Sequence, residues 1–430
     1  MSQIKAVRGT RDLLPPETKL WNHIEATARR VFARYAFGEI RTPIFEDTQL
    51  FSRSVGEETD IVSKEMYTWE DRPRAQSEKA QSLTLRPENT AGVVRAYIEH
   101  NLGDAGLLQK LYYIGPQFRR ERPQKGRYRQ FFQIGAEVIG PPSAGSESPL
   151  RDAEVLEMLA TLLGELGIAD WTLELNSVGS AQDRPKYVQA LREALVGIAP
   201  TLCVDCQRRA VTNPLRVLDC KVPEDQEKIH ALPKIADFLD DDSRAHCAAV
   251  RAALDACGVS YHVNPRLVRG LDYYTRTTFE FTHGGLGAQN ALLGGGRYDG
   301  LSEAIGGPKA PGIGFAIGAD RLVLTLQTAA SGDRSASALA DVYVAPLGEA
   351  QQAQALVLAR ELRRAGLRVE LGDGTFRLKK SFEFGNKLAR AIVLFGEDEA
   401  RSGQIAVKKF ATGEQAKVPR GELAEVLRKS

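Results

Sequence analysis

The stretch from Tyr112 to Gly140 constrains the fold most, because it joins two apolar, β-favouring arms through a basic centre. Aromatic and branched residues around a middle that contains Pro123 and Gly126 predict two antiparallel strands joined by a long loop. From Arg119 to Arg129 the chain has six Lys or Arg residues and one acidic residue. Such a run is often only a solvated loop, but arginine forks also match phosphate oxygens, so phosphate or nucleic-acid binding is the functional alternative.

The arms of this hairpin also carry polar residues at positions where a strand gains little from them. Gln133 and Glu137 share one face at a two-residue period, with Gly135 between them. A residue without a side chain at this place leaves space for a ligand. We therefore expect a binding site on this face of the strand.

The composition indicates a globular protein with a basic tail. The 430 residues are 43% hydrophobic and 26% charged, which predicts two or three domains with large cores. Residues 340–430 hold 16 Lys or Arg and 12 Asp or Glu, a charge of +4, so the rest carries −2 of the total of +2. This distribution argues against a histone-like binder and fits a polyanionic partner that is contacted at a few places.

Cysteine usage and the N-terminus predict a cytoplasmic protein. Five cysteines without a dense framework indicate reduced thiols, and neither a signal peptide nor a membrane span is expected from the pattern. Cys203 and Cys206 form CVDC, Cys220 follows after 13 residues, and His230 could complete four zinc ligands. The spacing does not match a paired-knuckle zinc site, so free thiols are favoured and no metal ligand is assigned.

The segments before the hairpin predict a helix from Thr18 to Tyr35, an extended segment at Pro43, a short strand in DIVSKEMYTWED and a strand–turn–helix unit in QSLTLRPENTAGVVRAYIEH. Pro43 bars a central hydrogen-bonded strand position, so this segment is expected at an edge or an interface. Pro87 is expected in the first helical turn. Thr84 and Arg86 flank that corner, where a small ligand could be held.

Beyond the hairpin, PPSAGSESP predicts a flexible connector before an amphipathic helix and a strand. Helical patterns dominate from about residue 180 to 258, which predicts a helical insertion between two parts of one sheet. Strand signals then return, and Gly294 to Gly296 would let a ligand approach the backbone. After the polar linker SGDRSASALA, alternating strands and helices predict a small α/β domain.

Together these segments resemble histidyl-tRNA synthetases, a class II aminoacyl-tRNA synthetase family, over essentially the whole chain. RTPIFED is similar to motif 1 of the class, whose proline lies at the dimer interface; FRRERPQKGRYRQFFQIGAEVIG is similar to motif 2 and GIGFAIGADRL to motif 3. LVRGLDYYTRTTFEF and GGGRYDGL are similar to two histidine-specific signatures, and TLRPENTAG and RGTRDLLP also match. The tail resembles the anticodon-binding domain of a few sister synthetases.

The resemblance implies an α+β catalytic domain at residues 1–328, with a mostly antiparallel sheet flanked by helices and a helical insertion at about 180–258. A linker at 329–340 and a C-terminal α/β anticodon-binding domain at 341–430 would follow. The implied protein is a homodimeric histidine–tRNA ligase. It activates L-histidine with ATP, accompanied by Mg²⁺, to histidyl-adenylate and pyrophosphate, and transfers histidine to the 3′ end of tRNA(His).

The resemblance also implies roles for single residues. Arg119 would bind the α-phosphate and Arg321 the γ-phosphate end, with Arg127 also at ATP, while Arg269 would act on the carboxylate and α-phosphate from the other side. Arg269 and Arg119 are the implied catalytic residues, since both reactants are anionic and must be neutralised and aligned. The implied histidine-binding residues are Ser82, Leu83, Thr84, Gln133, Glu137, Arg269, Tyr273 and Tyr274. Glu137 suits the ammonium group.

Arg122 and Gln124 would contact the tRNA acceptor end. Taken singly, residues such as Arg269 could be ordinary surface or core residues, and only the joint occurrence of the segments in one order favours the functional interpretation. The rivals are a non-catalytic regulatory paralogue of ATP phosphoribosyltransferase, a class II synthetase for proline, threonine or glycine, and a plain RNA-binding protein. The histidine signatures, the nucleotide motifs and the tail argue against them.

Overall fold

The computed structural model describes residues 3–57, 59–71, 80–124, 126–286, 290–329 and 339–429. The chain forms two compact units, Met1–Ala330 (unit 1) and Ser331–Ser430 (unit 2). Most of the predicted linker lies outside the described residues. In the described part of the chain, no helix has the length and apolar character needed to cross a membrane.

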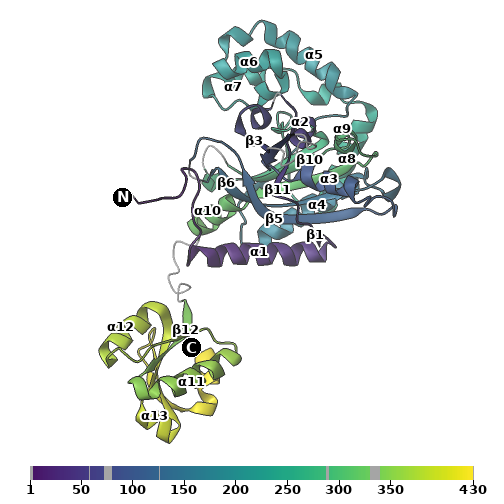
Figure 1. Ribbon diagram of the computed structural model, residues 1–430. Coiled ribbons are helices and arrows are strands. Elements are labelled where there is room, and N and C mark those ends of the chain that lie inside the picture. The colour runs from purple at the N-terminus through teal and green to yellow at the C-terminus, as the bar shows by residue number, and fades with distance from the viewer. Residues whose placement is uncertain are drawn as a thin grey trace. The chain divides into compact units, whose positions relative to one another are not determined.

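The centre of unit 1 is an eight-stranded sheet with the order β1-β5-β6-β11-β10-β9-β7-β8 (Figure 1). Its strands are β1 (Gly38–Glu39), β5 (Gln109–Phe118), β6 (Gln130–Ile139), β7 (Trp171–Ser177), β8 (His262–Val263), β9 (Thr275–His283), β10 (Ala291–Arg297) and β11 (Gly312–Gly318). Only the outer pairs β1–β5 and β7–β8 are parallel; the other neighbours are antiparallel. The predicted mostly antiparallel sheet is confirmed.

The two faces of this sheet carry different kinds of side chains. On β6, Ile134, Ala136 and Val138 point into the main hydrophobic core, so Gln133 and Glu137 lie on the opposite face. The core face is covered by four helices, with α1 along its length in Figure 1. These helices are α1 (Glu17–Arg34), α4 (Pro149–Glu165), α8 (Asp241–Cys257) and α10 (Ala319–Ala329). The opposite face, called the site face below, carries Gln133, Gly135 and Glu137 on β6.

The predicted hairpin is confirmed as β5 and β6, which pair antiparallel from Gln109↔Ile139 to Phe118↔Gln130. The loop between them is held against the start of the chain. The Arg129 N–H donates to the Gly9 carbonyl at 2.7 Å, and a Cβ on Gly9 would lie 2.8 Å from the Arg129 side chain. Gly9 has φ +91°, a left-handed conformation that glycine adopts without strain. The basic loop is therefore positioned by the segment RGTRDLLP.

A second, three-stranded sheet has the order β2-β4-β3, from strands β2 (Phe45–Asp47), β3 (Tyr67–Asp71) and β4 (Gln81–Leu85). Pro43 precedes the edge strand β2, as predicted. Helix α2 (Thr48–Val55) packs against this sheet, and α3 (Thr90–Glu99) and α9 (Leu301–Ala304) pack against α2. The strand expected in DIVSKEMYTWED is confirmed as β3, but Ile61–Glu65 before it is a π-helical turn. Pro87 is not in the first helical turn as expected, because α3 begins at Thr90.

The expected flexible connector PPSAGSESP is also corrected by the structure. It contains a 3₁₀ turn (Pro142–Ala144), and Ser148 caps α4 by accepting a hydrogen bond from the Leu150 N–H at 3.3 Å. The Ser146 side chain is buried, and its carbonyl accepts a hydrogen bond from Arg297 at 2.9 Å. The segment is ordered because a buried arginine needs this carbonyl, a contact that composition does not reveal.

The helical part of unit 1 stands apart from the sheet at the top of Figure 1. Its helices are α5 (Asp183–Val196), α6 (Val204–Thr212) and α7 (Pro223–His230), with 3₁₀ turns at Ala199–Thr201, Pro214–Asp219 and Ile235–Phe238. They share a core of their own, in which Tyr187, Cys206 and Ile229 are buried. In α8, by contrast, Val250 and Leu254 belong to the main core.

Unit 2 is an α/β layer structure whose five-stranded sheet has the order β13-β12-β14-β15-β16. The strands are β12 (Ala340–Pro346), β13 (Val369–Leu371), β14 (Ala389–Phe395), β15 (Gln404–Lys409) and β16 (Gln415–Pro419). The helices are α11 (Gln352–Arg364), α12 (Leu378–Leu388), α13 (Glu397–Ser402) and α14 (Leu423–Arg428). Helices α11 and α14 pack on one core, while Phe382 of α12 packs on a second. The two cores enclose the sheet, as expected for an α/β domain.

Candidate active site

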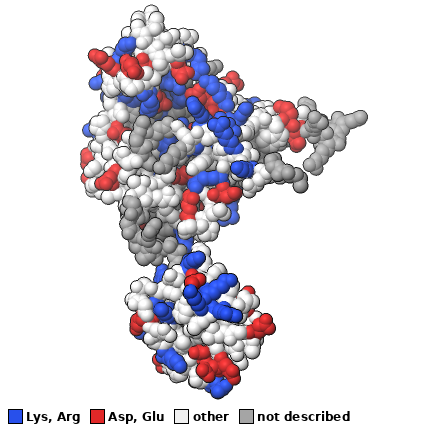
Figure 2. Space-filling view, turned by 90° about the vertical axis from the view of Figure 1, so that its left-hand side faces the viewer, with Lys and Arg blue, Asp and Glu red and all other residues white. Residues whose placement is uncertain are grey.

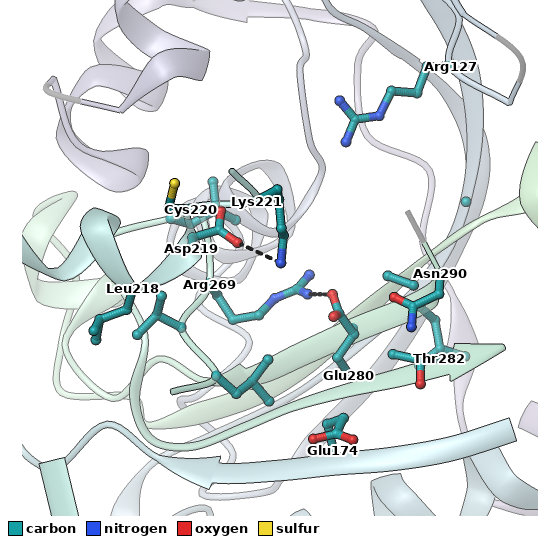
Figure 3. A pocket seen from close by; sticks show the side chains of 18 of the residues that line it. Arg127, Glu174, Leu218, Asp219, Cys220, Lys221, Arg269, Glu280, Thr282 and Asn290 are labelled. Atoms are coloured by element: carbon teal, nitrogen blue, oxygen red, sulfur yellow. Dashed lines mark hydrogen bonds and ion pairs between the residues drawn. The ribbon is translucent and has the colours of Figure 1, made fainter. Parts of the chain in front are cut away.

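A cavity of about 1200 Å³ opens on the site face of the eight-stranded sheet, bounded on one side by the helical part (Figure 3). The strands, the basic loop and α10 each contribute cationic or polar side chains to it. Five of the predicted site residues line it: Arg119, Arg127, Gln133, Arg269 and Arg321. The cavity is thus the place where four of the predicted arginines meet, from the hairpin loop, the segment before β9 and α10.

Arg269 is the central cation of this cavity. Its Nη1 donates to Glu280 Oε1 at 2.6 Å, whereas its Nε is buried and has no hydrogen-bond partner among the described residues (Figure 3). Burial is the largest single influence and lowers the pKa of Arg269, but Glu280 together with Tyr274 and Asp219 outweighs it, so the pKa is raised. The guanidinium therefore stays charged and keeps hydrogen-bonding capacity for an anion.

The glycines on the site face have a different role from the one expected. A Cβ on Gly294 would lie 2.4 Å from Arg269 Nη1, and one on Gly135 would lie 2.4 Å from Tyr113 Cζ. The space that the sequence analysis assigned to a ligand is filled by side chains of the site itself. The glycines let Arg269 and Tyr113 lie flat on the sheet, and a ligand contacts these side chains instead of the backbone.

The other three predicted arginines of the cavity lie on the hairpin loop and on α10. Arg119 Nε donates to the Pro87 carbonyl at 2.9 Å, and Arg127 pairs with Glu121 at 3.1 Å. Arg321 donates to the Ala291 carbonyl, and burial, followed by the nearby charge of Arg127, lowers the pKa of Arg321. Cations that raise one another's energy in this way stabilise an anion placed between them.

Glu137 lies deeper on the same face and is fully buried. Thr90 Oγ1 donates to its Oε1 at 2.7 Å, while Oε2 has no partner in the described part of the chain. Burial raises the pKa of Glu137 to about 8. A Cβ on Gly314 would lie 1.6 Å from Oε2, so the glycine is required here. A buried carboxylate with an unpaired oxygen is suited to a cationic ligand.

The tyrosine pair lies beside this carboxylate. The rings of Tyr273 and Tyr274 have centroids 4.7 Å apart, and Tyr273 packs edge-on against Tyr298 at 6.0 Å. Burial raises the pKa of Tyr273 well above its ordinary value, with Tyr274 as the next cause. Both phenols therefore stay neutral and act as hydrogen-bonding walls.

The predicted residues Ser82, Leu83 and Thr84 lie on β4, outside the residues that line the cavity. Thr84 Oγ1 forms hydrogen bonds with Thr48 Oγ1 at 2.8 Å and Thr68 Oγ1 at 2.9 Å. The structure thus joins these hydroxyls to one another and leaves their role with histidine a prediction.

Arg86, which the sequence analysis placed beside a ligand, is buried by the surrounding backbone instead. It donates to the carbonyls of Pro116 at 3.0 Å, Thr42 at 3.0 Å and Pro43 at 3.2 Å. Arg122 and Gln124 are exposed on the loop, also outside the cavity lining.

Sequence reasoning missed Glu280, Tyr113 and Gln117. Gln117 is fully buried and neither atom of its amide has a partner among the described residues; the same holds for the Tyr113 hydroxyl. Both lie on β5 at the two-residue spacing that places them on the site face. Glu280 stands between Phe279 and Phe281, which face the main core. The alternation of buried apolar and polar residues was the signal that could have found all three.

Unit 1 has a mostly antiparallel sheet with an arginine-lined cavity beside the hairpin that resembles motif 2, and a separate α/β unit follows it. This is the arrangement of a class II aminoacyl-tRNA synthetase. Family models match in the same order: histidyl-tRNA synthetase over residues 9–322 and an anticodon-binding domain over residues 341–430. The chain belongs to the histidyl-tRNA synthetase family.

Similar proteins agree over the full length of the chain. A histidine–tRNA ligase of Koribacter versatilis (strain Ellin345) is 70% identical over 99% of this chain and 96% of its own length. One of Solibacter usitatus (strain Ellin6076) is 57% identical over 98% of each chain. The structure of apo S. aureus histidyl-tRNA synthetase, 36% identical, has a TM-score of 0.78 and covers 99% of this chain and 100% of its own. These matches favour the ligase over the regulatory paralogue.

Proposed function

We infer that the chain is an aminoacyl-tRNA ligase that activates L-histidine with ATP and transfers it to tRNA(His). The observation that carries the chemistry is Arg269, a half-buried and incompletely paired cation that faces the arginines of the hairpin loop and α10 across one cavity. Adenylation joins two anions, so its barrier falls most where fixed cations surround the reacting phosphate.

In the proposed reaction, a carboxylate oxygen of histidine attacks the α-phosphorus of ATP and pyrophosphate leaves. Arg269 contacts the carboxylate and the α-phosphate from one side, and Arg119 contacts the α-phosphate from the other. Arg127 and Arg321 bind the remaining phosphates. Mg²⁺ would be carried in with ATP; it takes one or two carboxylates together with substrate phosphates, and Glu121 and Glu280 are two of the carboxylates that line the cavity.

The amino acid is proposed to lie over Glu137 and the tyrosine pair. The unpaired Oε2 of Glu137 accepts from the histidine ammonium group. Gln133 lies four residues earlier on the same face of β6, and its Oε1 also has no partner among the described residues. Tyr273, Tyr274 and the hydroxyl side of β4 enclose the rest of the substrate. Ser82, Leu83 and Thr84 reach it if β4 moves toward the cavity on binding.

Pyrophosphate–ATP exchange in the absence of tRNA tests this proposal. Exchange is expected with histidine alone of the twenty amino acids, because the proposed activation residues all precede residue 330. Exchange with another amino acid and none with histidine would refute the substrate assignment. Omission of Mg²⁺ should abolish exchange, and restored activity on adding it tests the metal part separately.

We propose a division of labour on tRNA between a catalytic domain at residues 1–328, with a helical insertion at about 180–258, and an anticodon-binding domain at 341–430 that follows a linker at 329–340. The Lys and Arg side chains gathered along the middle of one face of unit 1 in Figure 2 fit a nucleic-acid backbone. Arg122 and Gln124, exposed on the loop beside the cavity, are proposed to contact the acceptor end.

Truncation after Ala329 tests this division. The shortened chain should keep histidine-dependent exchange but charge full tRNA weakly, because its phosphate contacts to the anticodon arm are lost. Arg122→Ala should instead impair charging even of a minihelix without an anticodon. If the truncation impairs the minihelix as much as the full tRNA, unit 2 does not act at the anticodon arm.

We also propose that the protein is a cytoplasmic homodimer. Ile44, Phe45 and Trp69 are 44%, 53% and 40% exposed beside Pro43, and Phe45 and Trp69 pack edge-on at 6.2 Å. An exposed apolar cluster on an edge strand is suited to a second copy. Light scattering at micromolar concentration should give the mass of a dimer, and a monomer would refute this. Phe45→Glu should shift the mass toward the monomer, with Leu356→Glu, an exposed leucine of unit 2, as control.

A further inference from the structure

Three cysteines and one aspartate of the helical part meet at one point. In the described part of the chain, the side-chain ligand atoms of Cys203, Cys206, Cys220 and Asp225 all lie within 4.8 Å of one another. The Sγ atoms of Cys203 and Cys220 are 3.8 Å apart, and Cys220 Sγ lies 3.4 Å from Asp225 Oδ2. His230, the fourth ligand considered from the sequence, is exposed and directs Nδ1 at the Gln226 carbonyl at 2.6 Å.

The separations of Cys220 Sγ from Cys203 Sγ and from Asp225 Oδ2 are those of a tetrahedral metal site. A zinc ion with Zn–S bonds of about 2.3 Å holds two sulfur atoms about 3.8 Å apart, and a sulfur and a carboxylate oxygen about 3.5 Å apart. The packing of two cysteines in an apolar core does not by itself explain why a third cysteine and an aspartate lie beside them. The cluster therefore has the four ligands that zinc requires, all within 4.8 Å of one another, and two of its pairs already have the tetrahedral spacing.

The surroundings of the cluster are also built for a bound ion. Cys206 and Cys220 are both buried in the apolar core of the helical part, which excludes water from the point where the ligand atoms meet. The backbone N–H groups of Cys203 and Val222 point at Asp225 Oδ2, at 3.0 Å, and at Cys220 Sγ, at 3.4 Å. Such N–H donors orient the ligands of a metal and offset the negative charge of thiolates.

We propose that Cys203, Cys206, Cys220 and Asp225 bind one structural Zn²⁺. Thiolates favour soft or borderline cations over Mg²⁺ or Ca²⁺, and a closed set of four protein ligands is typical of structural zinc. The thiols bind zinc as thiolates, so binding releases their protons.

The proposed zinc site lies at one side of the active-site cavity and holds together the segments that form it. It joins the start of α6, the segment after the 3₁₀ turn Pro214–Asp219 and the start of α7. Cys203 and Cys220 line the cavity themselves, and the neighbours of Cys220, Asp219 and Lys221, form an ion pair at 3.4 Å that faces Arg269 (Figure 3). The zinc thus holds two charged residues beside the central cation of the site.

Metal analysis of the full-length protein, purified without chelator, tests the proposal. About one zinc per chain is expected in the wild type. Cys206→Ala should lose this zinc, whereas Cys257→Ala, at an exposed cysteine on the same part of the chain, should retain it. Asp225→Asn provides a second ligand variant with a smaller change in volume, and it should bind zinc more weakly.

Cobalt gives a readout that does not depend on activity or on the folding of a variant. Wild-type protein stripped by a chelator and titrated with Co²⁺ alone should develop the intense visible bands of tetrahedral thiolate coordination, saturating at about one equivalent. Wild type that carries no zinc and binds neither Zn²⁺ nor Co²⁺ under reducing conditions would overturn the proposal. So would loss of two of the five free thiols to a Cys203–Cys220 disulfide in protein that is active without metal.

Discussion

Arg269 and Arg297 both lie against the same sheet, yet their surroundings differ: the Arg269 side chain is 24% exposed, whereas that of Arg297 is fully buried. Arg297 is fully buried and fully paired: it contacts Asp152 at 2.6 Å, Asp299 at 2.9 Å and the Ser146 carbonyl at 2.9 Å. Arg269 has one ion pair, and its Nε has no partner among the described residues. Both arise in segments similar to histidine signatures, so the sequence pattern does not separate them.

The difference in hydrogen-bond pairing distinguishes an arginine that stabilises the fold from one that binds a ligand. A saturated arginine has no capacity left for a ligand, so its charge serves the fold by joining α4 to β10. An arginine with a buried, unpaired donor costs stability, and such a cost is retained where a substrate completes the pairing. The comparison predicts that damage at Arg297 appears in stability and damage at Arg269 in rate.

The largest effect is expected from Arg297→Met. It leaves the Asp152 carboxylate buried without its partner and should lower the free energy of unfolding by about 3–5 kcal/mol. Denaturant unfolding followed by circular dichroism measures this. Adding Asp152→Leu should recover much of the loss, because the unpaired charge is removed with it. Unchanged unfolding in the single variant would show that the pair is not structural.

Arg269→Ala should act on rate instead. Exchange of pyrophosphate should fall by roughly 10²–10³-fold, since a cation is removed from the developing charge of the transition state. The unfolding transition should stay close to that of the wild type, because Glu280 is partly exposed and can be solvated. A near-normal rate would remove Arg269 from the catalytic residues.

Gly294→Ala sharpens the comparison by keeping the charge and moving it. The new Cβ would lie 2.4 Å from Arg269 Nη1, so the guanidinium must shift. A displacement of this size should slow exchange by roughly ten- to a hundredfold. Gly164→Ala, where a Cβ meets nothing within 4 Å, is the matched control and should leave the rate unchanged. Equal rates in both variants would mean that the position of Arg269 is not critical.

The smallest effect concerns Glu137, whose pKa is raised from 4.5 to about 8. Without histidine bound, burial favours the protonated form of Glu137. The stability that this protonation contributes is therefore present at low pH and is lost as the pH rises through 8. The histidine ammonium needs the carboxylate, so the dissociation constant for histidine should fall about eightfold between pH 7 and 8.5. Calorimetry measures this, and Glu137→Gln should remove the dependence. A pH-independent constant in the wild type would contradict the pairing.

Much of the fold was predictable because it depends on local repetition. The alternation in β6 identified the face that carries Gln133 and Glu137, and turn residues located the basic loop. The π-helical turn at Ile61–Glu65 was missed because a short apolar run fits a helix or a strand equally well. The connector around Ser146 was misjudged because its small polar residues are typical of loops, while its order comes from a distant arginine.

The sequence by itself determined which residues share a strand face and which motifs the chain carries, since backbone geometry alternates side chains without regard to the rest of the fold. Only the tertiary structure decided which distant residues meet. It placed Arg269 over Gly294, brought the Ser146 carbonyl to Arg297, and put Asp225 rather than His230 beside the cysteines. The physical reason is that such contacts depend on the packing of whole helices and strands, which no local spacing encodes.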